Sequence, residues 1–96
     1  MEKQDVIAAL AALAHETRLD AFRQLVQAGP EGMAAGALAA ALDTPPATLS
    51  FHLKELRNAR LLTSERSGLH IRYAPDFASM NALVGYLGEN CCGGSC

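Results

Sequence analysis

One stretch, residues 44–57, most constrains the fold, because it combines a helix start, one apolar stripe and one polar face. Its apolar residues recur at i, i+4 and i+7 and so share one side of a helix: Leu49, Leu53 and Leu56. Thr44 before Pro45 predicts an N-cap followed by a proline that needs no amide partner. We therefore expect a helix from Pro45 to about Arg60, with the leucines buried and the other side exposed.

Three helices are predicted before this one. Apolar residues at helical spacing mark the first two, with Val6, Ile7, Leu10 and Leu13 on one and Leu19, Phe22, Leu25 and Val26 on the other. Gly29-Pro30 ends the second helix. A short third helix is expected from about Ala35 to Leu42, with Leu38 and Leu42 facing inward. Asp43-Thr44 then forms a turn so tight that the third and fourth helices make a helix-turn-helix.

A hairpin and a last helix complete the predicted order. Leu62 to Arg66 and His70 to Tyr73 are expected to be short strands, with Ser67-Gly68-Leu69 as the tip between them. Asp76 caps a final helix whose apolar stripe consists of Phe77, Met80, Leu83, Val84 and Leu87. The predicted fold class is mainly α with a small β-hairpin, a winged helix-turn-helix of order α-α-α-α-β-β-α. Residues 1–90 form the domain and residues 91–96 a flexible cysteine-bearing tail.

The exposed side of the helix at 44–57 and the hairpin carry side chains that suit DNA. Small donors near a helix start can enter a major groove, while longer cations reach phosphates. His52 lies at the edge of the buried stripe, which favours a packing or phosphate-contacting role over base reading. The predicted DNA-binding residues are Pro46, Ala47, Thr48, Ser50, Phe51, His52, Lys54, Arg57, Arg66, Ser67, Gly68, His70 and Arg72.

Charge is distributed unevenly along the chain. The net charge is −2, which by itself argues against a nucleic-acid partner. The segment from Lys54 to Arg72 nevertheless holds five cations (Lys54, Arg57, Arg60, Arg66 and Arg72) against Glu55 and Glu65, a local balance of +3. Because phosphate binding depends on the field of the contacting face, this basic segment favours a DNA footprint.

Several protein classes are excluded by composition. No apolar run approaches the about 18 residues that a membrane span needs, and the start lacks a signal peptide's basic leader, so we expect a cytoplasmic protein without a membrane partner. Thiols stay reduced there, so three crowded cysteines are expected to be ligands or reactive groups rather than structural disulfides. No paired acid and base accompanies the cysteines, so an enzyme is not expected. A thiol enzyme or a metalloid carrier is the alternative hypothesis from a different class of protein.

Four segments of the chain carry a family resemblance when taken together: Leu13-Ala14-His15-Glu16-Thr17-Arg18-Leu19, Thr48-Leu49-Ser50-Phe51-His52-Leu53-Lys54-Glu55-Leu56, Arg60-Leu61-Leu62 and Arg66-Ser67-Gly68-Leu69-His70-Ile71-Arg72-Tyr73. They resemble the ArsR/SmtB family of bacterial metal-responsive repressors. The resemblance implies a repressor that binds double-stranded operator DNA. We expect a homodimer that pairs through its first and last helices and binds an inverted repeat, since two-fold symmetry places two recognition helices in successive major grooves.

The tail supplies three soft donors within six positions: Cys91, Cys92 and Cys96. Gly93-Gly94 allows the chain to fold back, and three thiolates without a fourth ligand suit trivalent arsenic or antimony better than structural Zn²⁺. Some arsenic-responsive members of the family carry such a C-terminal cluster. We therefore expect As(III) or Sb(III) as effector, with no cofactor required; a soft divalent metal (Cd²⁺, Pb²⁺ or Zn²⁺) or thiol oxidation is the alternative signal.

Overall fold

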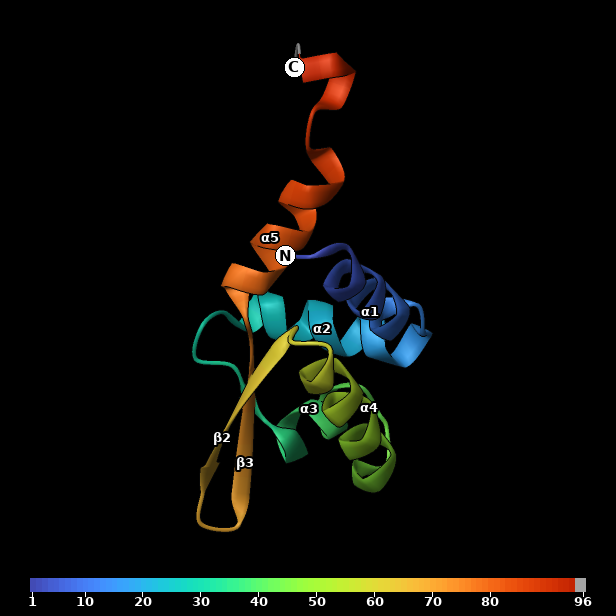
Figure 1. The fold of residues 1–96 in the computed structure, drawn as a ribbon. Helices are drawn as coiled ribbons and strands as arrows, with labels where there is room; N and C mark the ends of the chain where they lie inside the picture. The colour runs from blue at the N-terminus through green and yellow to red at the C-terminus, as the bar shows by residue number, and fades with distance from the viewer. Residues whose placement is uncertain (95–96) are drawn as a thin grey trace.

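The computed structural model describes residues 1–94, so the prediction for Cys96 lies outside the described residues. The elements follow in the order α1 (Lys3–Leu13), α2 (Glu16–Ala28), β1 (Met33–Ala34), α3 (Ala35–Ala41), α4 (Pro46–Asn58), β2 (Leu62–Ser67), β3 (His70–Pro75), α5 (Phe77–Gly88) and a 3₁₀ turn, η1 (Cys91–Gly94) (Figure 1). This order confirms the predicted winged helix-turn-helix and adds a short strand, β1, that the sequence did not reveal.

The sheet has three antiparallel strands in the order β1-β3-β2. In the hairpin, Leu62 is paired with Pro75 and Ser67 with His70, so the turn is tighter than predicted and both strands are longer. β1 joins the other edge of β3, where Met33 pairs with Tyr73. The wing is thus attached along one edge to the chain that leads directly into α3.

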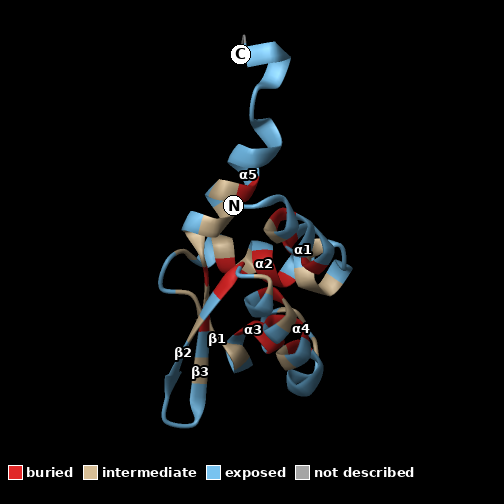
Figure 2. Ribbon diagram, in the orientation of Figure 1, coloured by how far each residue is buried: buried red, intermediate tan, exposed pale blue. Residues whose placement is uncertain are grey.

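The core lies where α1 to α4 meet the base of the sheet (Figure 2). The largest fully buried side chains are Leu25, Leu38, Leu49, Leu53, Leu56 and Leu61. All three leucines of the predicted α4 stripe are among them, which confirms that interpretation. On α1, by contrast, Val6, Ala9 and Ala12 face the core, whereas Ile7 and Leu10 are 58% and 42% exposed. Leu19 of α2 is exposed as well.

The turn between α3 and α4 is formed by backbone hydrogen bonds. Asp43 has a left-handed φ of 48°, its amide donates to Ala40 O, and the Thr44 amide donates to Ala39 O. This pattern is a Schellman ending, with aspartate in the position that glycine commonly holds. The predicted N-cap was wrong: Pro45 is the N-cap of α4, and the Thr44 hydroxyl donates instead to Leu42 O.

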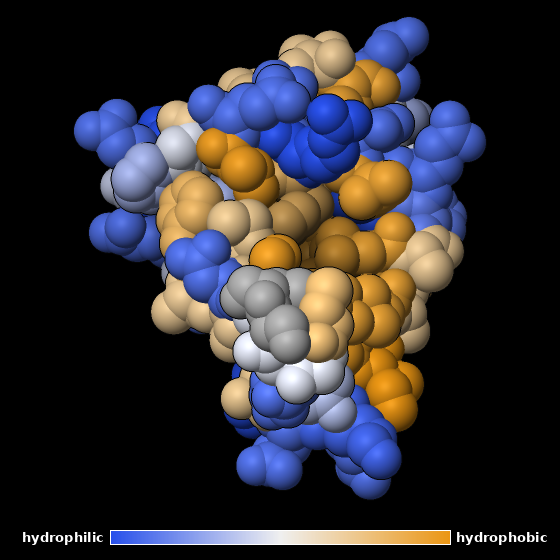
Figure 3. Space-filling model, turned by 90° about the horizontal axis from the view of Figure 1, so that it is seen from above, coloured by the Kyte–Doolittle hydropathy of each residue, from blue (hydrophilic) through white to orange (hydrophobic). Residues whose placement is uncertain are grey.

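α5 projects from the body at the end opposite α4 and the hairpin tip (Figure 1). Asp76 caps it by accepting a hydrogen bond from the Ser79 amide at 3.1 Å, as predicted. Leu83 is its buried residue, whereas Val84 and Leu87 of the predicted stripe are 65% and 60% exposed. Hydrophobic side chains also gather on the face seen from above, from which α5 rises (Figure 3).

None of the helices within residues 1–94 has the length and apolar character that crossing a bilayer would require.

Candidate nucleic-acid interface

The surface of α4 opposite its leucines is open to solvent over the whole helix. Phe51 is 56% exposed and Ser50 is half-buried. The remaining predicted contact residues on this surface are exposed: Pro46, Ala47, Thr48, Lys54 and Arg57. Small and hydroxyl side chains occupy the first turns and cations the later ones. The structure therefore exposes the side chains to which base-reading and phosphate-binding roles are assigned, and those roles stay predictions.

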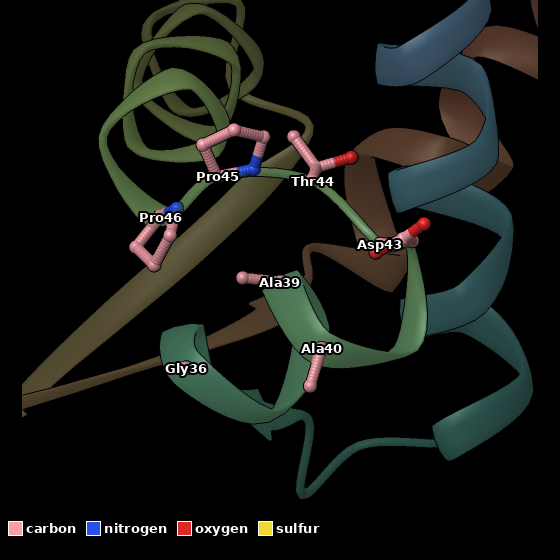
Figure 4. Close-up of a pocket in the computed structure, with 7 residues that line it drawn as sticks. All are labelled: Gly36, Ala39, Ala40, Asp43, Thr44, Pro45 and Pro46. Atoms are coloured by element: carbon pink, nitrogen blue, oxygen red, sulfur yellow. The ribbon is translucent and has the colours of Figure 1, made fainter.

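The start of α4 is accessible because small residues border it. A hollow of ≈ 440 Å³ lies beside the turn (Figure 4), and its lining consists of Gly36, Ala39, Ala40, Asp43, Thr44, Pro45 and Pro46. Within residues 1–94 no side chain caps the helix, so the amides that follow Pro46 in its first turn have no capping acceptor. Free amides and the positive end of a helix dipole attract phosphate. A DNA backbone could therefore approach this end of α4 closely.

His52 is the predicted contact residue that the structure places in the interior, with only 8% of its surface exposed. Its Nδ1 accepts a hydrogen bond from Nε of Arg18 at 3.1 Å, and its ring lies 4.5 Å from that of His15. This burial favours the packing role of His52 over base reading, and contact of His52 with a phosphate stays a prediction. His15 in turn caps α2 by accepting from the Thr17 amide.

The surroundings of His52 favour its neutral form. Burial lowers the pKa of His52 below its ordinary value of 6.5, and the nearby His15 and Arg18 lower it further, while Glu55 acts in the opposite direction. A neutral imidazole with a free Nδ1 lone pair is also what the Arg18 hydrogen bond requires. Arg18 was not among the predicted site residues, because nothing in the sequence connects positions 18 and 52.

The hairpin carries the remaining predicted contacts. Each of its predicted residues is exposed: Arg66, Ser67, Gly68, His70 and Arg72. Leu69 at the tip is 94% exposed and was not among the predicted DNA-binding residues. Arg72 differs from Arg66, the other arginine of the hairpin, because its Nη1 donates to the carbonyl oxygens of Glu31 and Gly32, each at 3.1 Å. Its guanidinium therefore holds the loop before β1, and Arg66 is the more available wing cation.

The described tail cysteines, Cys91 and Cys92, are exposed and lie beyond α5. Cys92, Gly93 and Gly94 all have left-handed φ values, of 52°, 67° and 90°, so the chain turns sharply there. Within residues 1–94 no three His, Cys, Asp or Glu side chains are grouped as a metal site. The predicted three-sulfur site needs Cys96, which lies outside that range.

Comparisons with known proteins agree with this geometry. The family model described as a helix-turn-helix domain matches residues 13–65. An ArsR-like transcriptional regulator from Rhodococcus sp. RHA1 is similar at 28% identity, with 88% of this chain and 76% of that chain covered and a TM-score of 0.75. No curated protein sequence matches the chain.

Two further solved structures are similar. The homodimeric winged helix-turn-helix DNA-binding domain of Mb0332 from Mycobacterium bovis has 28% identity, covers 91% of this chain and 81% of its own, and gives a TM-score of 0.70. The AntR antimony-specific transcriptional repressor has 30% identity over 90% of this chain and 77% of its own, with a TM-score of 0.72. Such regulators bind DNA and are not enzymes, in line with the expectation from sequence. With its exposed recognition helix and basic wing, the chain belongs to the ArsR/SmtB family of DNA-binding winged helix-turn-helix transcriptional regulators.

Proposed function

We propose that the chain is a homodimeric repressor that binds an inverted-repeat operator and leaves it when As(III) or Sb(III) binds the tail cysteines. The main support for this proposal is the position of the tail cysteines. The side chains of Cys91 and Cys92 are adjacent and exposed beyond α5, the helix that projects away from the DNA-reading surface (Figure 1). A ligand there can be bound without competing directly with DNA.

The dimer is supported by apolar surface on two helices that contact each other, α1 and α5. We call this surface the α1/α5 face; its exposed members are Ile7, Leu10, Val84 and Leu87. Exposed apolar side chains gathered on one face are typical of an interface. The occupant we assign is a second copy of the chain, since the Mb0332 domain of similar fold is homodimeric. Two-fold pairing would then present two α4 helices to one side of a DNA duplex.

The effector assignment rests on the chemistry of the donors. Each thiol that replaces a hydroxyl of arsenous acid forms one As–S bond and releases one water, so three cysteines give a neutral tris-thiolate and three waters. The lone pair of arsenic occupies the fourth direction, so no fourth ligand is needed. Thiolates are the soft ligands that such an ion prefers. The similar AntR protein is an antimony-specific repressor, which supports the same chemistry here.

The tail can influence α4 through a short covalent and hydrogen-bonded connection. α5 begins next to Asp76, whose amide donates to Leu61 O at 2.9 Å, and only Ala59 and Arg60 separate Leu61 from the end of α4. A change in the angle of α5, and so in the pairing of two subunits, would alter the spacing of the two recognition helices. A typical coupling free energy of about 1 to 3 kcal/mol would lower operator affinity about 5- to 150-fold.

The first experiment identifies the DNA. Purified, thiol-reduced protein is used to select duplexes from a random-sequence library. We expect enrichment of an inverted repeat whose half-sites lie about one helical turn apart. Enrichment of single, unpaired half-sites would contradict the dimeric reading.

The second experiment measures anisotropy of the selected duplex, labelled with fluorescein, with and without arsenite. Wild-type protein should release the duplex, whereas Cys91→Ser, Cys92→Ser and Cys96→Ser should respond weakly or not at all. Asn90→Gly is the matched control, because it alters the tail without removing sulfur and suits the φ of 57° at that position. If arsenite leaves the DNA affinity of the wild-type protein unchanged, the assignment of As(III) as effector is wrong. Release of DNA by Cd²⁺ and not by arsenite would establish a soft divalent metal as the effector. A response that survives truncation after Asn90 would remove the tail from the mechanism.

A further inference from the structure

Four side chains join the recognition helix to the start of α2. Arg18 donates from Nε to Nδ1 of buried His52 at 3.1 Å, and its guanidinium carbon lies 5.8 Å from the ring centroid of exposed Phe51. The ring of His52 also lies 4.5 Å from that of His15 and 5.6 Å from that of Phe51. We call these four residues the α2/α4 cluster.

Arg18 contacts both the buried and the exposed side of α4. His52 belongs to the side that packs on the body, whereas Phe51 belongs to the side assigned to DNA. A half-buried guanidinium over an aromatic face is an attractive arrangement, because the ring presents negative charge toward the cation. The position of Arg18 therefore limits the directions in which Phe51 can point.

We propose that Arg18 is a positioning residue for DNA reading, which holds α4 through neutral His52 and Phe51 and is released when His52 gains a proton. Protonation from solvent converts Nδ1 from an acceptor into a donor, so the hydrogen bond from Arg18 is lost. Two cations then face one another in a partly buried space. Arg18 moves away, and Phe51 loses the group that holds it.

The groups around His52 oppose its protonation. His15 and Arg18 act from the α2 side and make a positive charge unfavourable, and burial does the same, while Glu55 on α4 favours it. These are the ionisable groups that act on His52. Acidification thus weakens a contact that neutral pH maintains. Arg18→Gln should raise the pKa of His52, because it removes a positive charge beside the imidazole.

The first test needs no DNA. Nuclear magnetic resonance of ¹⁵N-labelled imidazoles should show His52 as the tautomer protonated at Nε2, with a pKa that rises in Arg18→Gln. Arg23→Gln is the matched control, because Arg23 is an exposed cation on the same helix, and it should leave the His52 titration in place. A wild-type His52 protonated at Nδ1, or one whose pKa does not respond to Arg18→Gln, would overturn the proposal even if the protein binds DNA as proposed.

The second test uses the selected duplex in a His70→Gln background. His70 is an exposed histidine of the wing, so this background removes a second imidazole from the DNA-binding surface and leaves His52 as the imidazole under test on α4. In this background, affinity should fall about 2- to 12-fold from pH about 7.5 to about 5.5, the range expected for loss of one net hydrogen bond. A random-sequence duplex should show a smaller decrease, because a positioning residue affects specific contacts most.

Substitution of His52 separates positioning from a general effect of acid. His52→Asn retains an acceptor near the position of Nδ1 but does not titrate, so it should flatten the pH profile of the His70→Gln protein. Circular dichroism at both pH values checks that each variant is folded. If the His52→Asn protein loses affinity on acidification as steeply as its parent, or if the parent shows no decrease, the proposal is wrong.

Discussion

Gly32 lies directly against the carbonyl oxygen of Tyr73, so closely that a Cβ at position 32 would overlap the β3 backbone. Its φ is also left-handed, at 69°. This contact allows the loop after α2 to reach the sheet edge where β1 pairs with β3, and Arg72 also holds this loop through a hydrogen bond to the Gly32 carbonyl. The attachment of the wing to the helical body therefore depends on one residue without a side chain.

Gly32→Ala should destabilise the protein strongly, because it combines a strained φ with a backbone overlap. We expect a loss of at least about 2 kcal/mol in the free energy of unfolding, measured by urea denaturation at fixed protein concentration. Gly36→Ala is the matched control, since nothing lies within 4 Å of the added Cβ, and it should be neutral or stabilise α3 by up to about 1 kcal/mol. Equal effects of the two substitutions would contradict the close approach at Gly32.

Val84→Asp should convert the proposed dimer to monomer. A carboxylate placed within an apolar interface has no partner there, so the dimer dissociation constant should rise at least about 100-fold, as measured by sedimentation equilibrium. Leu69→Asp introduces the same charge at the exposed hairpin tip and should leave the association state as it is. A Val84→Asp protein that still sediments as a dimer would show that the α1/α5 face is not the interface.

Lys54→Ala combined with Arg57→Ala should weaken DNA binding and reduce its dependence on salt. Loss of two phosphate contacts predicts a decrease of about 2 in the slope of log K against log salt concentration. Lys3→Ala with Arg23→Ala removes the same charge from α1 and α2, at positions outside the nucleic-acid interface. The salt dependence of DNA binding by this control should change little. The measurement is a salt titration of anisotropy, and an unchanged slope for the first variant would remove these cations from the phosphate contacts.

The stability of the protein should fall as the pH drops below about 6.5, since His52 has a lowered pKa in the folded state and the unfolded chain binds its proton more readily. The stabilisation is fully present above the unfolded pKa and is lost progressively below it. Thermal unfolding between about pH 7.5 and about pH 5 measures this trend. His52→Asn should show a shallower decrease than wild type, and an equal decrease would assign the acid sensitivity to other groups.

The sequence predicted the elements whose apolar spacing is regular and missed those set by contacts between distant residues. The leucine stripe of α4 and the Asp76 cap follow from local spacing, and both are confirmed. β1 is only two residues long and exists because β3 passes beside it, so no pattern could reveal it. The pairing of Arg18 with His52 joins positions 34 apart and could not be found from spacing either.

Apolar spacing assigned some residues to the correct helix without indicating which surface they contact. Periodicity identifies one face of a helix, and it does not state whether that face meets the same chain or another one. Ile7 and Leu10 continue the pattern of α1, yet small alanines beside them make the intramolecular contact. The alanine-rich composition permits this close packing and leaves the larger side chains outside.

The projection of α5 has a consequence for how such a regulator can change its signal. Among the described residues, Leu83 is the last one that the core buries, so the residues that follow α5 can vary at little cost to the packing of the core. Substitutions there are free to exchange one chemical input for another while the same promoter is read. Detection and readout can thus evolve at separate rates within a single small domain.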